Sequence, residues 1–152
     1  MRLVCAQTSL KVFLYHIPSI SKVGASLDGD FGMAALAPLV ADIDNFVGFK
    51  YTYEDFYDLS QVAGFEDAAS GGRRFEVFFG RDEMMTAGLA APIDGFVGST
   101  YNFASPIYAA LLRAHETGDD AEASVLMADA QVRKDAVHKE ARHAGKAKYA
   151  QP

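Results

Sequence analysis

The sequence predicts an α/β fold built on parallel strands, and two observations support that prediction. Four short apolar segments each precede a segment with helical periodicity, so strands and helices alternate along the chain. Such alternation favours parallel strands joined by right-handed helical crossovers. Two architectures fit this order: a small open doubly wound sheet, or part of a (β/α)₈ barrel, whose complete form needs about 250 residues.

The four predicted strands occupy residues 11–18, 46–52, 74–80 and 94–102. The first and third, KVFLYHIP and RFEVFFG, are nearly continuous apolar runs. Runs of this kind are typical of strands that are covered on both faces of a sheet. The sequence therefore predicts a sheet with helices packed against it.

A helix is expected after each strand, at residues 27–40, 54–69, 83–91 and about 105–116. Pro38 is a mild conflict near the end of the first helix, and the glycine pair at 71–72 marks the end of the second. The segment TGDD separates the fourth helix from a last one at 121–144. The remaining tail is expected to be frayed.

Composition and charge exclude several classes of protein. The 152-residue chain has a net charge of −6 and no basic stripe, which disfavours nucleic acid and anionic membranes as partners. The single cysteine, Cys5, excludes a disulfide within the chain and a cysteine metal cluster, and it fits a reducing cytoplasm. No apolar run has the length of a membrane span, and the four histidines lack metal-ligand spacing.

Polar residues follow the predicted strands at the point where each strand ends. In both candidate architectures, ligands bind beyond the carboxyl ends of the strands. These positions hold Tyr15 and His16 after the first strand, Lys50 and Thr52 after the second, Gly80, Asp82 and Glu83 after the third, and Ser99, Thr100, Tyr101 and Asn102 after the fourth. The sequence thus predicts one polar cluster at one rim of the sheet.

Lys50 is the most reactive candidate in this cluster. Side chains alternate along a strand, so Phe49 and Tyr51 are expected on the face opposite to Lys50. An amine attacks a carbonyl only when it is unprotonated, and an apolar pocket favours that neutral form. Such a lysine can form a Schiff base with a keto substrate. Taken alone, a strand-end lysine that reaches solvent is the commoner case.

The other polar residues also have two interpretations each. Tyr15 could transfer a proton to or from a substrate, or bond to the backbone as an ordinary strand tyrosine. Asp82 and Glu83 could bind sugar hydroxyls, or could simply be favoured by the dipole at a helix start. Thr52 and Ser99 could each cap a helix or hold a substrate hydroxyl. Their gathering at one rim favours the functional interpretation.

Four motifs resemble the second half of a known enzyme family. LYHIPS, VGFKYT, FFGRDE and GFVGSTYN are similar, in order and spacing, to the class I pyruvate aldolases that include dihydrodipicolinate synthase and N-acetylneuraminate lyase. The resemblance runs from about residue 12 to about residue 118. G-x-D-E at residues 80–83 and GSTYN at 98–102 favour the N-acetylneuraminate lyase branch. Ile20 stands where the synthase branch usually carries an arginine.

The resemblance implies a partial TIM (β/α)₈ barrel with about four parallel strands, equivalent to strands five to eight, with covering helices and a C-terminal helix. Residues 1–118 would form the half-barrel, 119–145 the C-terminal helix and 146–152 a flexible tail. Four strands leave two unpaired edges and an exposed apolar face. We therefore expect self-association, or pairing with a first half of the barrel.

The resemblance also implies roles for individual residues. Lys50 would form an imine with pyruvate or with the ketone of open-chain sialic acid, and Tyr15 would transfer a proton. The substrate would be held by Thr52, Gly80, Asp82, Glu83, Gly98 and Ser99. The implied reaction is reversible cleavage of N-acetylneuraminate to N-acetylmannosamine and pyruvate, without a metal or organic cofactor.

Two alternatives stay open. The family's loop after strand two, which grips the pyruvate carboxylate, has no counterpart in this sequence. An inactive fragment, or a sugar-binding or assembly module, would fit that absence. The second alternative is another pyruvate-dependent aldolase of the same family, acting with a different aldehyde.

Overall fold

The computed structural model of the chain describes residues 1–21 and 32–148, and the side chains up to residue 142. It contains two compact units, Met1–Gly98 and Ser99–Pro152. The predicted division into a half-barrel, a C-terminal helix and a tail stays a prediction. Residues 27–31 of the first predicted helix, and residues 149–152 of the tail, lie outside the described residues.

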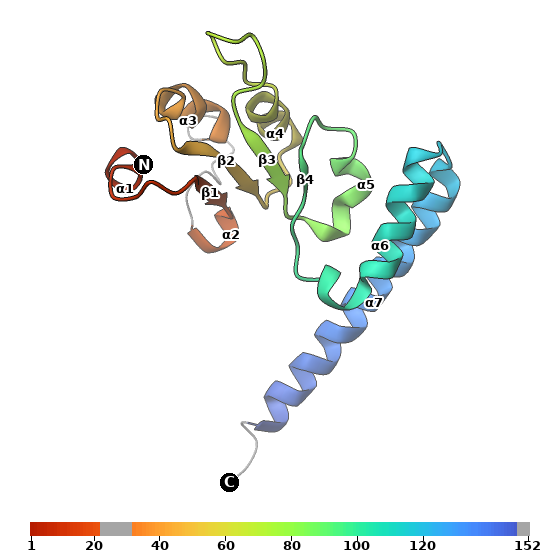
Figure 1. The fold of residues 1–152 in the computed structure, drawn as a ribbon. Coiled ribbons are helices and arrows are strands. Elements are labelled where there is room, and N and C mark those ends of the chain that lie inside the picture. Colours follow the sequence, from red (N-terminus) through yellow and green to blue (C-terminus); the bar gives the residue numbers. More distant parts are fainter. Residues whose placement is uncertain (22–31, 149–152) are drawn as a thin grey trace. The chain divides into compact units, whose positions relative to one another are not determined.

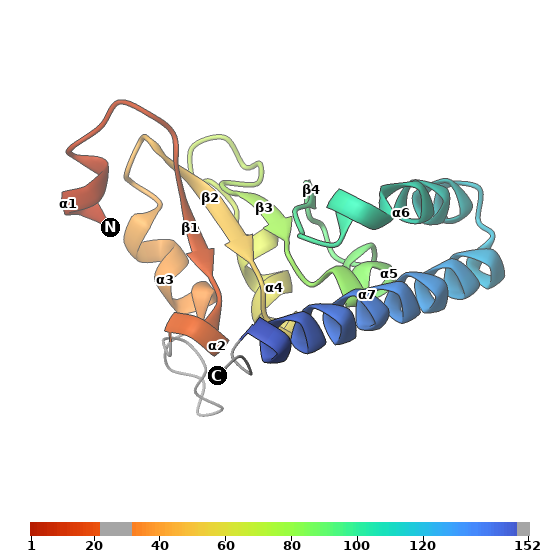
Figure 2. The same cartoon turned by 90° about the horizontal axis from the view of Figure 1, so that it is seen from below.

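The first unit holds a four-stranded sheet (Figure 1). Its strands are β1 (Val12–His16), β2 (Phe46–Tyr51), β3 (Glu76–Phe79) and β4 (Gly95–Phe96). All neighbours pair in parallel and follow one another in chain order, as the view in Figure 2 also shows. A doubly wound sheet reverses its strand order at a switch point, whereas a barrel wall does not. The four-stranded partial barrel is therefore confirmed.

The strands are shorter than predicted at their carboxyl ends. β1 ends at His16 because a short helix, α2 (Pro18–Ser21), begins at Pro18, and proline is well suited to the first position of a helix. β4 comprises only two residues, and the chain leaves the sheet before Ser99. The polar residues at the rim therefore lie on connecting segments just beyond the strands.

The helices of the first unit also differ in length from the prediction. α1 (Arg2–Cys5) was not predicted, and α3 (Met33–Val40) includes Pro38. α4 (Phe56–Ala63) ends six residues early, with Gly64 as its C-cap, because the following loop folds back through a bridge between Glu66 and Arg73. The third predicted helix is a 3₁₀ turn, η1 (Asp82–Met84), followed by α5 (Met85–Gly88).

The core lies between the sheet and its covering helices. Phe49 and Tyr51 are fully buried on the face opposite to Lys50, as the alternation predicted. The ring of Phe49 lies 5.3 Å from that of Phe46 and 5.2 Å from that of Phe75, all centroid to centroid. Burying each such ring contributes about 1.5–3 kcal/mol to the free energy of folding.

A buried carboxylate links the two covering helices to the sheet. Asp58 of α4 accepts hydrogen bonds from Met33 N at 3.0 Å, from Ala34 N at 2.8 Å and from the Tyr51 hydroxyl at 2.9 Å. The first two donors open α3, whose N-cap, Gly32, has no room for a Cβ beside this carboxylate. Asp58 therefore caps a helix other than its own.

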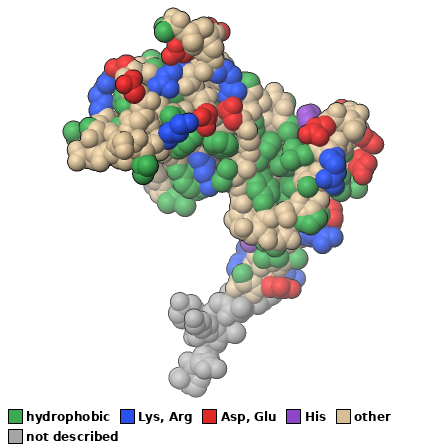
Figure 3. All heavy atoms as spheres, viewed as in Figure 1, with side chains coloured by type: hydrophobic (Ala, Val, Ile, Leu, Met, Phe, Trp, Pro, Cys, Tyr) green, Lys and Arg blue, Asp and Glu red, His purple; other side chains and the backbone are tan. Residues whose placement is uncertain are grey.

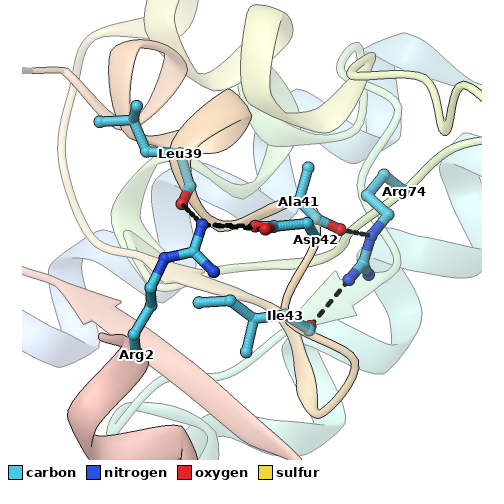
Figure 4. Close-up of polar contacts among 6 residues, drawn as sticks. All are labelled: Arg2, Leu39, Ala41, Asp42, Ile43 and Arg74. Carbon is cyan, nitrogen blue, oxygen red and sulfur yellow. Dashed lines mark hydrogen bonds and ion pairs between the residues drawn. The ribbon is translucent and has the colours of Figure 1, made fainter.

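Two arginines hold the connection between α3 and β2 (Figure 4). Arg74 donates to Ala41 O at 2.8 Å and to Ile43 O at 3.0 Å, and Arg2 donates to the Asp42 carboxylate at 2.7 Å. These contacts lie at the amino ends of the strands, and they fix the sheet at the end opposite to the polar rim.

The second unit is a helical hairpin of α6 (Tyr101–Glu116) and α7 (Asp120–Lys148) (Figure 1). Gly118, with a φ of 76°, allows the tight turn between them. Leu111 of α6, and Met127 and Ala130 of α7, are buried. α6 begins four residues earlier than predicted, so that Pro106 lies inside it.

The surface charge and the cysteine of the described residues agree with the composition. On the face drawn in Figure 3, acidic and basic side chains are interspersed over the first unit. Within the described residues, no helix combines the length and apolar character that a membrane crossing requires. Cys5 is a buried free thiol. The cytoplasmic location stays a prediction.

Candidate active site

Lys50 and Tyr15 lie side by side on adjacent strands. Tyr15 of β1 is the register partner of Lys50 of β2, and Lys50 is in turn the partner of Phe78 of β3. The Lys50 Nζ lies 4.3 Å from the centroid of the Tyr15 ring, within the range of a cation–π contact. Within the described part of the chain, no carboxylate forms an ion pair with this amine.

Thr52 and Gly80 extend the site from the ends of β2 and β3. A Cβ placed on Gly80 would collide with Thr52 Oγ1 and would lie 3.4 Å from Lys50 Cε. Thr52 Oγ1 is buried and has no hydrogen-bond partner among the described residues. The helix after it is capped instead by Asp55, whose carboxylate accepts from Asp58 N at 3.0 Å. The capping interpretation of Thr52 is therefore wrong, and a role of its hydroxyl in binding substrate stays a prediction.

Asp82 and Gly98 approach each other closely in the first unit. Asp82 opens η1 and is 4% exposed, and a Cβ on Gly98 would overlap its carboxylate. Gly98 therefore allows the chain after β4 to pass directly against this carboxylate. The alternative in which Asp82 serves only the helix dipole also fits its place at the start of η1.

Arg81 was missed by the sequence analysis. It lies between Gly80 and Asp82, and its guanidinium forms ion pairs with Glu54 and, at 3.4 Å, with Glu83. The carboxylate of Glu83, which was predicted to bind sugar hydroxyls, is thus held by the guanidinium of Arg81. The sequence did contain a signal for Arg81, because a charged residue occupies the variable position of the G-x-D-E motif.

Ser99 belongs to the second unit, whereas the other candidates belong to the first. Its side chain is exposed, and its backbone oxygen accepts from Asn102 Nδ2 at 3.0 Å. The N-cap of α6 is Thr100, so Ser99 does not cap that helix. A role in binding substrate stays a prediction.

His16 ends β1 but lies on the buried face, away from Lys50. Its ring packs against Tyr51 at 4.9 Å and Tyr53 at 5.7 Å, between centroids. Burial lowers its pKa below the ordinary value of 6.5, although the charges of Asp58 and Asp55 act in the opposite direction. Burial also raises the pKa of the Tyr51 hydroxyl above its usual range. The negative charge of Asp58 raises this pKa further.

The side chains of the described residues do not form a ligand group of the kind that binds metal ions in proteins. The described residues contain no group of three or more His, Cys, Asp or Glu side chains placed to hold a metal ion. What the rim does assemble is an amine, a phenol, a hydroxyl with no partner among the described residues, and carboxylates. These groups suit covalent binding of a carbonyl compound and hydrogen bonding to hydroxyls.

Comparison with known proteins identifies the family. The model of the Dihydrodipicolinate synthetase family matches residues 1–144. The chain belongs to this family. Its four-stranded sheet is a part of the barrel that members of the family form, consistent with the sequential strand order.

Several relatives are N-acetylneuraminate lyases. One from Lactiplantibacillus plantarum is 34% identical over 110 residues, which cover 72% of this chain and 33% of that protein. The solved structure of the Proteus mirabilis N-acetylneuraminate lyase is 30% identical, with a TM-score of 0.67 over 83% of this chain and 39% of that one. The chain spans about a third of the length of the curated relatives it matches.

Another similar structure is named only as a member of the wider family. A prophage protein of the dihydrodipicolinic acid synthase family from Escherichia coli, solved in complex with pyruvate, is 25% identical with a TM-score of 0.65. It matches 86% of this chain and 41% of its own. The similarity thus extends to a family member that is not named as an N-acetylneuraminate lyase.

Proposed function

We propose that this chain carries the Schiff-base part of a pyruvate-dependent aldolase site, with Lys50 as the amine that reacts with a keto acid. The observation that best supports this role is the placement of Lys50 beside Tyr15 as register partners on one face of adjacent strands, with no ion pair to Lys50 among the described residues. A lysine neutralised by a carboxylate would be a structural element, whereas this amine faces an aromatic ring and the open inner face of the sheet.

The proposed reaction begins with addition of the Lys50 amine to the substrate ketone and loss of water, which gives a protonated imine. The imine accepts the electron pair of the carbon–carbon bond as that bond breaks, and an aldehyde leaves as its hydroxyl loses a proton. Tyr15 is the group proposed to move that proton. Protonation of the resulting enamine, and hydrolysis, release pyruvate and restore the amine.

The sugar part is proposed to bind at the ends of β2 and β3. The Thr52 hydroxyl and the carboxylates of Asp82 and Glu83 can bond to sugar hydroxyls, and Gly80 and Gly98 permit close approach of the ligand to the backbone. Ser99 is proposed as a further contact. On this basis N-acetylneuraminate is the proposed substrate, with N-acetylmannosamine and pyruvate as products, as the names of these relatives suggest.

A second candidate is an aldolase of the same family that joins pyruvate to another aldehyde. The observation that favours it is the similarity to the prophage protein, whose name gives pyruvate as its ligand and specifies no sugar. Condensation of pyruvate with a panel of N-acyl sugars and simpler aldehydes distinguishes the two. A preference for N-acetylmannosamine supports the lyase assignment, and a preference for a different aldehyde supports the second candidate.

Trapping of the imine tests the role of Lys50 directly. The full chain, incubated with pyruvate and then reduced with borohydride, is expected to gain the mass of one reduced pyruvate, located by peptide mapping at Lys50. Lys50→Ala should lose this adduct. Lys11→Ala is the matched control, because Lys11 precedes β1, is exposed and pairs with Glu76 at 3.8 Å.

Two outcomes would contradict the proposal: absence of an adduct in the wild-type chain, or an equal adduct in Lys50→Ala. Tyr15→Phe separates the two roles. It should keep the reduced adduct and lose aldol cleavage, because the phenol is proposed to move a proton and not to form the imine. Loss of imine formation itself in Tyr15→Phe would reassign Tyr15 to positioning the amine.

A further inference from the structure

The inner face of the sheet carries large side chains and glycines in alternation. Phe13 on β1 is the register partner of Gly48 on β2, and Phe78 on β3 is the partner of Gly95 on β4. The rings of Phe13 and Phe78 meet across β2 with their centroids 5.6 Å apart. In these two pairs, β1 and β3 contribute large aromatic rings, and β2 and β4 contribute glycines that leave room for those rings.

This alternation matches half of one interior layer of a (β/α)₈ barrel. Such layers contain four side chains from alternate strands. Phe13 and Phe78 provide two of the four. Among the described residues, Phe13, Tyr15 and Val97 stay 37%, 46% and 43% exposed on this face, so the layer is open on the side where the other two side chains belong.

Both edges of the sheet are also open in the described part of the chain. Val12 N donates to Asn45 O at 2.8 Å, and His16 O accepts from Thr52 N at 2.8 Å, so these residues bond towards β2. In a parallel strand the bonding direction alternates, so the backbone groups of Phe13 and Tyr15 point away from β2. β4 pairs with β3 on one side only. Unpaired edges of this kind favour addition of another strand.

We propose that a second copy of this chain closes the barrel. A two-fold rotation about the barrel axis places β1 of each copy beside β4 of the other and keeps all eight strands parallel. It brings Phe13 and Phe78 of the second copy into the open half of the layer. It also continues the alternation across each new junction, because Gly95 of one copy then lies on the strand next to Phe13 of the other.

The second copy is preferred over an unrelated partner because each open edge is complementary to the other edge of the same chain. The charged residues at the inner-facing strand positions of β1 to β4 are Lys50 and Glu76, which have opposite signs, so a second copy would bring no excess of one charge into the barrel. The inference does not depend on the proposed chemistry, because association is measured without substrate.

Light scattering after size exclusion of the full chain is expected to give twice the chain mass of 16.4 kDa. Phe13→Asp, which places a charge inside the barrel, should yield a monomer. Gly95→Val tests the same junction without removing a contact, because its Cβ lies 3.4 Å from a Phe78 ring carbon and fills space that the second copy needs. Leu39→Asp is the control, since Leu39 lies on α3 and is 65% exposed.

Amide hydrogen exchange locates the interface. The amide of Tyr15 should be protected in the wild-type dimer and should exchange rapidly in Phe13→Asp, while the buried amides of β2 stay protected in both. A monomeric wild-type chain at micromolar concentration overturns the proposal. A dimer that survives both barrel variants but is lost in Val132→Asp also overturns it, because Val132 is an exposed residue of α7 and would mark pairing through helices.

Discussion

Lys50 differs from an ordinary strand-end lysine in the residues that surround its side chain. Its stem passes Gly80, where an added Cβ would lie 3.4 Å from Lys50 Cε, and its amine lies over the Tyr15 ring. A glycine at this position leaves room for both the stem of Lys50 and the hydroxyl of Thr52. The reactivity proposed for Lys50 therefore depends on a residue with no functional group of its own.

Gly80→Ala is expected to destabilise the fold and displace Thr52. The new Cβ collides with Thr52 Oγ1, so the side chain or the strand end has to move. Overpacking of this kind costs about 1–3 kcal/mol in the free energy of unfolding, measured by urea denaturation. The matched control is Gly72→Ala, whose Cβ would meet Ser70 Oγ at 3.7 Å. Equal stability of the two variants would contradict the crowding inferred at Gly80.

The sequence predicted the positions of individual side chains correctly where the regular alternation of a strand determines which face a side chain occupies. The two-residue period of strands placed Lys50 opposite to Phe49 and Tyr51, and the parallel order placed Tyr15 beside Lys50. It failed for Arg81 and for the contact of Asp58 with α3, because these depend on the path of loops between elements. The period of a strand is local, whereas a loop path is set by tertiary packing.

At the scale of elements, helix length was predicted less well than helix order. α4 stops at Gly64 because its C-terminal continuation is replaced by the fold-back around Gly71, which has a φ of 70°. α2 begins at Pro18, inside what was predicted as strand. Apolar periodicity detects that a helix follows a strand, but end points are set by single capping and turn residues.

Asp58 is expected to be the most sensitive position of the element packing. Asp58→Ala would leave the amides of Met33 and Ala34 and the Tyr51 hydroxyl without this acceptor in a buried site. The Tyr51 hydroxyl keeps the Asp55 carbonyl oxygen as an acceptor at 2.9 Å. Each of the two orphaned amides costs about 1–3 kcal/mol, so the free energy of unfolding should fall by about 2 kcal/mol or more. Urea denaturation followed by circular dichroism measures the loss.

Asp55→Ala is the matched comparison for Asp58. Asp55 caps its own helix through one bond to Asp58 N at 3.0 Å, and loss of such a cap costs about 0.5–2 kcal/mol. The expected order is therefore a larger loss for Asp58→Ala than for Asp55→Ala. The reverse order would show that α3 does not rely on the carboxylate of α4.

For the whole molecule, stability is expected to fall in mild acid because of His16. The residue is 3% exposed, its Nε2 has no hydrogen-bond partner among the described residues, and burial lowers its pKa below 6.5. The unfolded chain then binds more protons than the folded chain between the lowered pKa and about 6.5. Stability is complete above about pH 6.5 and declines as the pH falls towards the folded-state pKa.

His16→Phe should flatten this decline, because it keeps an aromatic ring against Tyr51 and Tyr53 while it removes the titrating group. The measurement is the free energy of urea unfolding at about pH 7, 6 and 5, a range that brackets the ordinary histidine pKa. The pKa values of Asp42 and Asp67 are lowered below 3.8, so these carboxylates titrate below this range. His138→Gln, at an exposed position of α7, should keep the wild-type slope. An unchanged slope in His16→Phe would assign the acid sensitivity to other groups, since a buried neutral imidazole is the cause inferred here.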